Sequence, residues 1–417
     1  MNRVISAFGR AVERLSVRQP GAARALLSAG FAETALQSHL PLPGTSPAGR
    51  CLSGLCAQAV LRPFLHPERS VLVSVFTPCE QLHALGLIPM FPEGIACYLS
   101  GVGAENYFLR LAERSGVPET LCSYHKTLLG LARAGVLPKP LCIVHTTLAC
   151  DANNLTFREL ARFYQVPRFV LDVPYDGEVG ALETQLKELG AFLEEQTGER
   201  LEEGRLGETV VRARHSLENF QRALLQGPRG NADPSREMQK IYALHVLLGT
   251  PQAERYTELL LAEPPAGNSR KIRLLWLHTL PHWQEPVGRL LAGRCQIVAC
   301  DMTCDWRSPK EEDPVRWMAA RLAGDSFNGD AGRRIAGACS LARELDADGA
   351  VCFCTWGCRQ TAGMARLAKE ALEAQGVPTL VLDGDGCDRS NGGGERMLTR
   401  LEAFLEQLEG KRGGEVQ

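Results

Sequence analysis

The chain has 417 residues, a formal net charge of −2 and a hydrophobic content of 45%. This length suffices for two ordinary domains, and the composition is typical of a globular rather than a disordered protein. The balanced charge, without a Lys/Arg-rich block, argues against binding to nucleic acid or an anionic membrane. The first residues lack the apolar core of a signal peptide, and no apolar run approaches the ~20 residues that cross a bilayer, so we expect a cytoplasmic protein.

The first part of the chain predicts helices followed by a parallel sheet. Residues 1–66 are rich in Ala, Leu, Pro and Gly and have a helical pattern around residues 22–36, which predicts an N-terminal helical appendage. Short β-branched runs then alternate with helical patterns, as in SVLVSVF, LCIVHTTLAC, NLTFRELARFYQ and RFVLDVPY. Strand, helix and strand in succession favour a parallel α/β sheet. Residues 178–262 are charged and amphipathic, and they predict a helical connection.

A second α/β unit follows this connection. Its apolar runs KIRLLWLHTL, CQIVACDM, GAVCFC and TLVLDGDG alternate with helical patterns, and the chain ends in the helical segment GERMLTRLEAFLEQLEG. We therefore predict an α/β fold with two doubly wound, Rossmann- or flavodoxin-like domains that contain parallel sheets. The expected division is an appendage over 1–66, a first domain with a helical insertion over 67–265, and a second domain over 266–417.

The chain contains 15 cysteines, an odd number. Because a reducing cytosol keeps thiols free, metal binding or catalysis explains them better than a disulfide framework. A free cysteine is also a small core hydrophobe, and we expect that role for four cysteines in apolar runs: Cys142, Cys295, Cys300 and Cys352. Others follow predicted strand ends, where an open parallel sheet binds its ligands: Cys150, Cys354, Cys358 and Cys387.

The spacing of these strand-end cysteines narrows the choice of metal. The stretch CFCTWGC offers CxC and CxxxC without a nearby second pair, whereas structural zinc sites usually combine two CxxC-like pairs. Iron–sulfur clusters take thiolates from dispersed loops, so this arrangement suits them better. From spacing alone, an iron–sulfur site and a chance grouping of core cysteines both stay open.

Longer blocks carry a family resemblance. The segments GLIPMFPEG, LCSYHKTLLG, TTLACDANNLTFRELARFYQVPRFVLDVPY, FCTWGCRQTAGMARLAKEALEAQGVPTLVLDGDGCDRSN and TRLEAFLEQLE resemble the 2-hydroxyacyl-CoA dehydratase / benzoyl-CoA reductase superfamily, and most closely its double-cubane cluster branch. The resemblance extends from about residue 71 to 409. It implies a [4Fe-4S] cluster held by three cysteines, which correspond here to Cys122, Cys150 and Cys358. In the double-cubane branch the resemblance implies an [8Fe-9S] cluster with six thiolates, and Cys79, Cys354 and Cys387 are the expected additional three.

The same resemblance implies a function and a partner. We expect an anaerobic, homodimeric iron–sulfur reductase that accepts low-potential electrons from a separate [4Fe-4S] ATPase and reduces a small unsaturated substrate. The chain itself contains no G-x-x-x-x-G-K-[ST] phosphate loop with which to hydrolyse ATP. One alternative is a single-[4Fe-4S] subunit of a 2-hydroxyacyl-CoA dehydratase or an aromatic acyl-CoA reductase. Another is an electron-transfer iron–sulfur protein without catalysis.

Three residues are candidate proton donors for such a reduction. His125 follows Cys122, His145 precedes Cys150, and Glu80 is adjacent to Cys79. Histidine and carboxyl groups near a redox centre can deliver protons. Each of the three residues has a structural alternative as a hydrogen-bonded, buried polar group.

Overall fold

The computed structural model describes residues 3–41, 44–267, 270–303, 308–391 and 393–414. Its centre consists of two four-stranded parallel sheets, which confirms the predicted fold class. The strands are β1 (Ser70–Val73), β2 (Ile88–Met90), β3 (Cys142–Thr146), β4 (Arg168–Leu171), β5 (Ile272–Leu277), β6 (Cys295–Cys300), β7 (Gly349–Thr355) and β8 (Thr379–Gly384).

Helices surround both sheets. They are α1 (Arg3–Arg18), α2 (Pro20–Gln37), α3 (Pro47–Leu65), α4 (Glu80–Ala84), α5 (Pro92–Val102), α6 (Asn106–Arg114), α7 (Ser123–Arg133), α8 (Asp151–Tyr164), α9 (Val179–Thr197), α10 (Glu203–Leu225), α11 (Pro234–His245), α12 (Pro251–Ala262), α13 (Glu285–Arg294), α14 (Pro314–Gly324), α15 (Ala331–Glu344), α16 (Arg359–Ala374) and α17 (Gly394–Gly414). None of the helices that the structure describes combines the length and the apolar character of a membrane span.

The two sheets share one strand order. The first runs β2-β1-β3-β4 and the second runs β6-β5-β7-β8, so each sheet has its second strand on one side of the first and its third strand on the other. This order places a topological switch point between β1 and β3, and an equivalent one between β5 and β7. The loops that leave the carboxyl ends of these four strands are therefore the places where each sheet forms a crevice.

Burial explains why the strands read as continuous apolar runs. All residues of β1, β3 and β6 are buried, as expected for parallel strands covered on both faces, whereas the edge strand β4 is partly exposed. One hydrophobic cluster includes Val71 and Val144 of the first sheet together with Leu274 and Phe353 of the second. The two sheets therefore share a continuous core.

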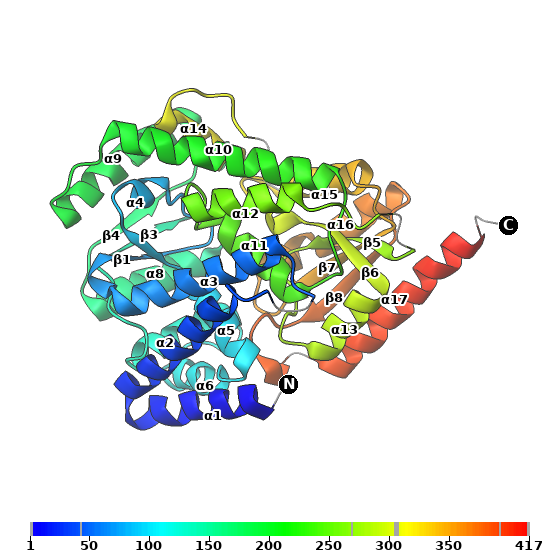
Figure 1. Cartoon of the computed structure of the whole chain (residues 1–417), viewed down its shortest axis with the longest axis horizontal. Coiled ribbons are helices and arrows are strands. Elements are labelled where there is room, and N and C mark those ends of the chain that lie inside the picture. Colours follow the sequence, from blue (N-terminus) through cyan, green and yellow to red (C-terminus); the bar gives the residue numbers. More distant parts are fainter. Residues whose placement is uncertain (1–2, 42–43, 268–269, 304–307, 392, 415–417) are drawn as a thin grey trace.

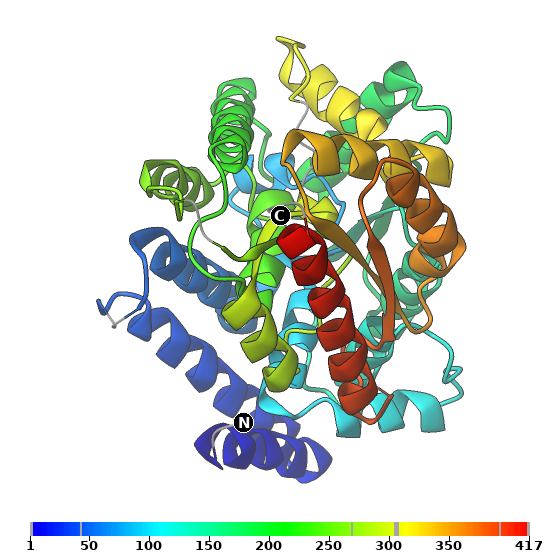
Figure 2. The same ribbon diagram turned by 90° about the vertical axis from the view of Figure 1, so that its right-hand side faces the viewer.

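The remaining helices hold this core from several sides. The N-terminal helices α1, α2 and α3 pack on one another, and α3 also contacts β2, α11 and α12. In Figure 1 the helices α9, α10 and α12 lie above the two sheets, in the region expected to be helical between residues 178 and 262. Figure 2 brings the last helix, α17, to the front beside α13.

Candidate functional site

The loops at the two switch points line one cavity of about 350 Å³. Val75 follows β1 and Cys150 follows β3, while His278 follows β5 and Cys358 follows β7; all four residues line this cavity. Helices α3, α5 and α11 supply most of the remaining wall. The carboxyl ends of both parallel sheets thus open into the same space, where this kind of fold binds ligands.

Three of the predicted thiols meet in this cavity, and each one precedes a helix. Cys122, Cys150 and Cys358 occupy the N-cap positions of α7, α8 and α16. They lie close enough for the charges of Cys150 and Cys358 to raise the pKa of Cys122. The partial positive charge at each helix N-terminus favours an anionic sulfur. The cavity wall thus gathers three candidate thiolate ligands at three helix N-termini.

Burial opposes ionisation of Cys122 and Cys150 in the absence of a metal. It is the largest cause that raises the pKa of Cys122, and it raises the pKa of Cys150 to about 12 although backbone N–H groups of Asn153 and Ala152 lower it. A bound metal cation would reverse this balance, because thiolate ligation releases the proton. In the described part of the chain, no group of three His, Cys, Asp or Glu side chains is arranged to hold a metal ion.

A glycine allows the two cysteine loops to approach each other. Gly357, directly before Cys358, has a φ of +76°. A Cβ atom at this position would lie 2.6 Å from the carbonyl oxygen of Thr120 and 2.9 Å from the backbone nitrogen of Cys122. Only glycine combines the left-handed conformation with so close a contact. The sequence TWGC thus brings the loop after β7 against the segment that carries Cys122.

Two buried histidines approach the thiols. The Nε2 atom of His125 lies 3.5 Å from Sγ of Cys150, and Nε2 of His278 lies 3.6 Å from Sγ of Cys358. Burial lowers the pKa of His125 to about 4 and that of His278 to about 3, so both rings are neutral at pH 7. A neutral imidazole can donate an N–H to a thiolate, which is a recurrent second-shell interaction around metal centres. The sequence analysis included His125 but missed His278.

Cys387 lies next to this group. It is wholly buried, and its pKa is raised well above the usual value by burial first and then by the charges of Cys97, Asp385 and Cys122. Its backbone nitrogen donates to Oδ1 of Asp385 and to Oγ of Ser123. Cys97, on α5, lines the cavity and was missed by the sequence analysis. The two thiols therefore form a group adjacent to Cys122.

Cys354 and Cys79, like Cys387, lie outside the cavity wall. Cys354 belongs to β7 and shares a face with Cys352, whose side chain packs in the core between the second sheet and its helices. Burial raises the pKa of Cys354, although a hydrogen bond with Thr361 of α16 lowers it. It lies close enough to Cys358 for the charge of that thiolate to raise its pKa. Cys79 is wholly buried, and its Sγ donates to the carbonyl oxygen of Thr77 at 3.2 Å.

Of the three candidate proton donors, the structure places only His125 in the cavity wall. His145 is buried in β3, where its ring stacks on Phe157 and its Nε2 accepts from Arg168 at 3.2 Å. Glu80 is wholly buried, and its Oε1 lies 2.6 Å from Nη2 of Arg321. Both residues have the surroundings of a structural polar group.

The Glu80–Arg321 pair leads to a stability prediction. Replacing Arg321 by methionine leaves a buried carboxylate without its partner, and we expect this to lower the free energy of unfolding by about 3–5 kcal/mol. Urea denaturation would measure the change. Arg316→Met removes only pairs in which the arginine is half exposed, with Glu311 and Glu183, and should cost less than about 1 kcal/mol. Equal losses in the two variants would contradict the assignment.

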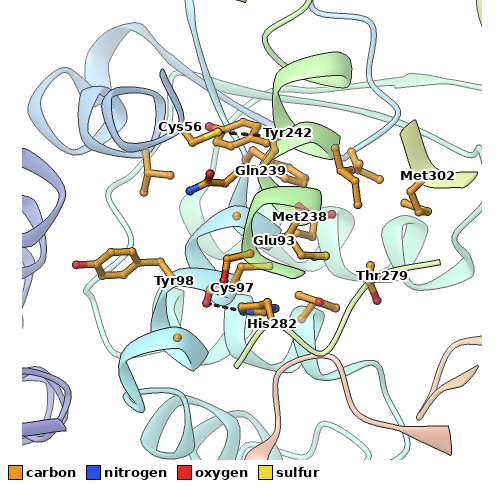
Figure 3. Close-up of a pocket in the computed structure, with 18 of the residues that line it drawn as sticks. Cys56, Glu93, Cys97, Tyr98, Met238, Gln239, Tyr242, Thr279, His282 and Met302 are labelled. Carbon is orange, nitrogen blue, oxygen red and sulfur yellow. Dashed lines mark hydrogen bonds between the residues drawn. The ribbon is translucent and has the colours of Figure 1, made fainter. Parts of the chain in front are cut away.

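A carboxyl group that the sequence analysis missed also faces the cavity. Glu93 lies in the first turn of α5, one helical turn before Cys97, and both side chains line the cavity (Figure 3). The spacing of these residues in PEGIACY places them on one helix face, and that was the available signal. No lysine or arginine lines the cavity among the residues that the structure describes.

Comparison with known proteins identifies the family of the chain. Residues 74–408, most of the chain, match the family described as 2-hydroxyglutaryl-CoA dehydratase, D-component. A search among curated proteins found no match. The matched range contains β2 to β8 and four cysteines of the cavity wall: Cys97, Cys122, Cys150 and Cys358. The chain therefore belongs to the 2-hydroxyglutaryl-CoA dehydratase D-component family, whose members are components of dehydratase and reductase enzymes.

Proposed function

We propose that this protein is the iron–sulfur component of a two-component reductase that adds electrons to a small, uncharged, unsaturated molecule. The observation that carries the proposal is the meeting of Cys122, Cys150 and Cys358 in one largely apolar cavity at the N-termini of three helices. Soft thiolates favour iron–sulfur chemistry, and a mostly apolar wall favours a neutral substrate.

The residues around the cavity fit a cluster. Cys122, Cys150 and Cys358 would supply three thiolates, and His125 and His278 would donate hydrogen bonds to sulfur. The Nδ1 atoms of both histidines are buried without a hydrogen-bond partner, so their present surroundings leave polar groups unsatisfied. A bound cluster would supply electrons at low potential, because several thiolates and sulfides concentrate negative charge.

The double-cubane form of the proposal needs six thiolates per chain. Cys387 supports it best among the additional candidates, since it lies close to Cys122. Cys97 is a further candidate from the cavity wall, whereas Cys354 faces α16 and Cys79 lies in a separate buried environment. We propose Cys387 and Cys97 as the thiols to test first for a second cubane.

The electron donor in this proposal is a separate iron–sulfur ATPase, since the family is generally activated by such a component. We further propose a homodimer that works in an anaerobic cytoplasm. The electron donor would have to approach the end of the cavity where Cys122, Cys150 and Cys358 lie, because electron transfer needs a short path to the cluster. Asp151 and Arg359, the first residues of α8 and α16, form an exposed ion pair of 3.2 Å beside Cys150 and Cys358.

An acyl-CoA dehydratase or reductase subunit with one [4Fe-4S] cluster is the second candidate, and the family supports it directly. Such an enzyme recognises a ligand with several phosphate groups, which proteins bind with arginine, lysine or helix N-termini. The described wall of the cavity contains no lysine or arginine. The adjoining cleft, which shares Ser235 and His282 with the cavity, contains Arg229, Arg236 and Arg289, so the lining favours an uncharged reacting end and leaves a place for phosphate groups outside the cavity.

The test is the iron and acid-labile sulfide content of protein purified without oxygen. We expect about eight irons per chain with slightly more sulfide than iron, as for two sulfide-bridged cubanes. About four irons would favour the single-cluster subunit instead. Protein without iron would contradict both. Reduction of the cluster without turnover of any unsaturated substrate would support an electron-transfer protein.

A further inference from the structure

Helices α2 and α3 form one end of the cavity, which we call the α3 end. Six of their residues line it: Phe31 and Thr34 from α2, and Ser53, Cys56, Ala57 and Val60 from α3. The four positions on α3 have the spacing of a single helix face. All six residues precede the range 74–408 that matches the family, whereas the other lining residues fall within it. The family match therefore does not define this end of the cavity.

The α3 end lies away from the three thiols expected to bind a cluster. Of these thiols, Cys150 has a pKa that is raised by burial first and, among nearby charges, by that of Glu93. Burial and then the charges of Cys56 and Glu93 raise the pKa of Tyr242. The wall thus runs from Cys150 through Glu93 and Tyr242 to Cys56 on α3. Figure 3 shows Cys56 and Tyr242 together, apart from Cys97.

The α3 end presents an apolar surface to the cavity. Its polar atoms are bonded within the wall. The Oγ1 atom of Thr34 donates to the carbonyl oxygen of Gly30 at 3.0 Å. Oγ of Ser53 and Sγ of Cys56 donate to Gln239, to Oε1 at 3.4 Å and to the carbonyl oxygen at 3.5 Å. The other three of the six side chains are hydrocarbon, so this end suits an apolar part of a ligand.

Close packing holds the α3 end in place. The ring centroid of Phe31 lies 4.5 Å from that of Tyr98 on α5 and 5.5 Å from that of Phe64 on α3. Phe31, Ala57 and Val60 are all buried. Because a close-packed wall has little room to yield, carbon atoms added or removed here change the length of the cavity.

We propose that Ala57 and Val60 set the length of the molecule that the cavity accepts. This molecule has its unsaturated group at the thiols and an apolar tail of several carbon atoms that extends to the α3 end. For its reacting group, the inference rests on the reductase function proposed above. The cavity volume of about 350 Å³ is within the range of ~300–1,000 Å³ that is usual for small-molecule sites. A two-carbon molecule would leave most of this volume without contacts, whereas a tail would fill it.

The test measures the binding of 1-alkynes of increasing length through the rise in melting temperature that a bound ligand causes. The wild-type protein should bind them up to a maximum length, the cut-off. In Ala57→Leu the added carbon atoms should shorten the cut-off and raise the Kd of the longest alkyne that the wild type binds roughly tenfold or more. In Val60→Ala the cut-off should lengthen, and the next longer alkyne should bind roughly tenfold more tightly.

The matched control is Ala59→Leu. Ala59 belongs to the same helix and is as buried as Ala57, with 7% of its surface exposed against 8%, but it does not line the cavity. This variant should keep the wild-type cut-off, and an equal shift in both leucine variants would overturn the inference. Where Ala57→Leu does not fold, Val60→Ala decides alone, and an unchanged cut-off in it would overturn the inference too.

Turnover separates this inference from the proposed function, because the binding measurement needs no reduction. Wild-type protein that binds alkynes with the expected cut-offs but reduces none of them with titanium(III) citrate would count against the reductase and support the role of α3. Wild-type protein that binds no alkyne, or binds all lengths equally, would overturn the inference. Reduction of acetylene by such a protein would still support the reductase.

Discussion

Protein with Cys358 replaced by serine, purified without oxygen, is expected to contain less than about half of the wild-type iron. Cys358 is at the N-terminus of α16 and lines the same cavity as Cys122 and Cys150, and its Sγ lies 3.6 Å from Nε2 of His278. A serine hydroxyl is a poor ligand for iron at neutral pH, because it stays protonated where a thiol in a cluster does not. Iron analysis and the visible absorption of the cluster measure the loss.

Cys295→Ser is the control for this experiment. Cys295 is wholly buried in β6 and does not line the cavity, so iron and reductase activity should stay at the wild-type level. Equal iron losses in both variants would contradict the ligand assignment. The same analysis of Cys387→Ser, Cys97→Ser and Cys79→Ser tests the second cubane: unchanged iron in all three would exclude any contribution from these thiols.

Gly357→Ala is expected to have the second large effect, a loss of iron without loss of the overall fold. An added methyl group would meet backbone atoms of Thr120 and Cys122, which cannot rotate away as a side chain can. The positive φ of Gly357 adds a strain of about 1–2 kcal/mol for a residue with a Cβ atom. The loop that carries Cys358 must therefore move away from Cys122, and the thiols separate.

Gly363→Ala is the matched control for this substitution. Gly363 lies within α16, and nothing is found within 4 Å of a Cβ atom at its position. Alanine there should stabilise the protein by about 0.5–1 kcal/mol, because it favours the helix. Circular dichroism shows whether each variant folds, and iron content shows whether it binds a cluster. A full complement of iron in Gly357→Ala would contradict the role of the close contact.

Local pattern was sufficient to predict the strands and two cysteines of the cavity, Cys150 and Cys358. Parallel strands buried on both faces leave continuous apolar runs, and Cys150 and Cys358 follow two of these runs directly. The order of strands within each sheet was outside the reach of this pattern, since it depends on contacts between distant segments. The family resemblance supplied Cys122, which follows no strand and is placed by α7.

Predicted residues that lie outside the cavity wall and wall residues that the sequence analysis missed have separate physical reasons. In β7, Cys352 and Cys354 are two residues apart and share a face, so strand alternation alone could have set Cys354 apart from the cavity. The sequence analysis missed Glu93 and Cys97 because an acid and a thiol one helical turn apart are a weak signal unless the cavity beside them is known. His278 has a φ of +78°, a backbone conformation that no sequence pattern predicts.

The shared strand order of the two sheets has a mechanical consequence. The units β3–Cys150–α8 and β7–Cys358–α16 occupy equivalent positions in the two halves of the molecule. One metal group bound by both thiols would therefore cross-link the two halves. The neighbouring residues Asp151 and Arg359, which form an ion pair, are 208 residues apart in the sequence. Cross-links that close long loops restrict the unfolded chain by several kcal/mol, about 5 in disulfide models. Oxidative damage to the bound metal would then lower the stability of the whole molecule, and exposure to oxygen would be measurable as a fall in its melting temperature.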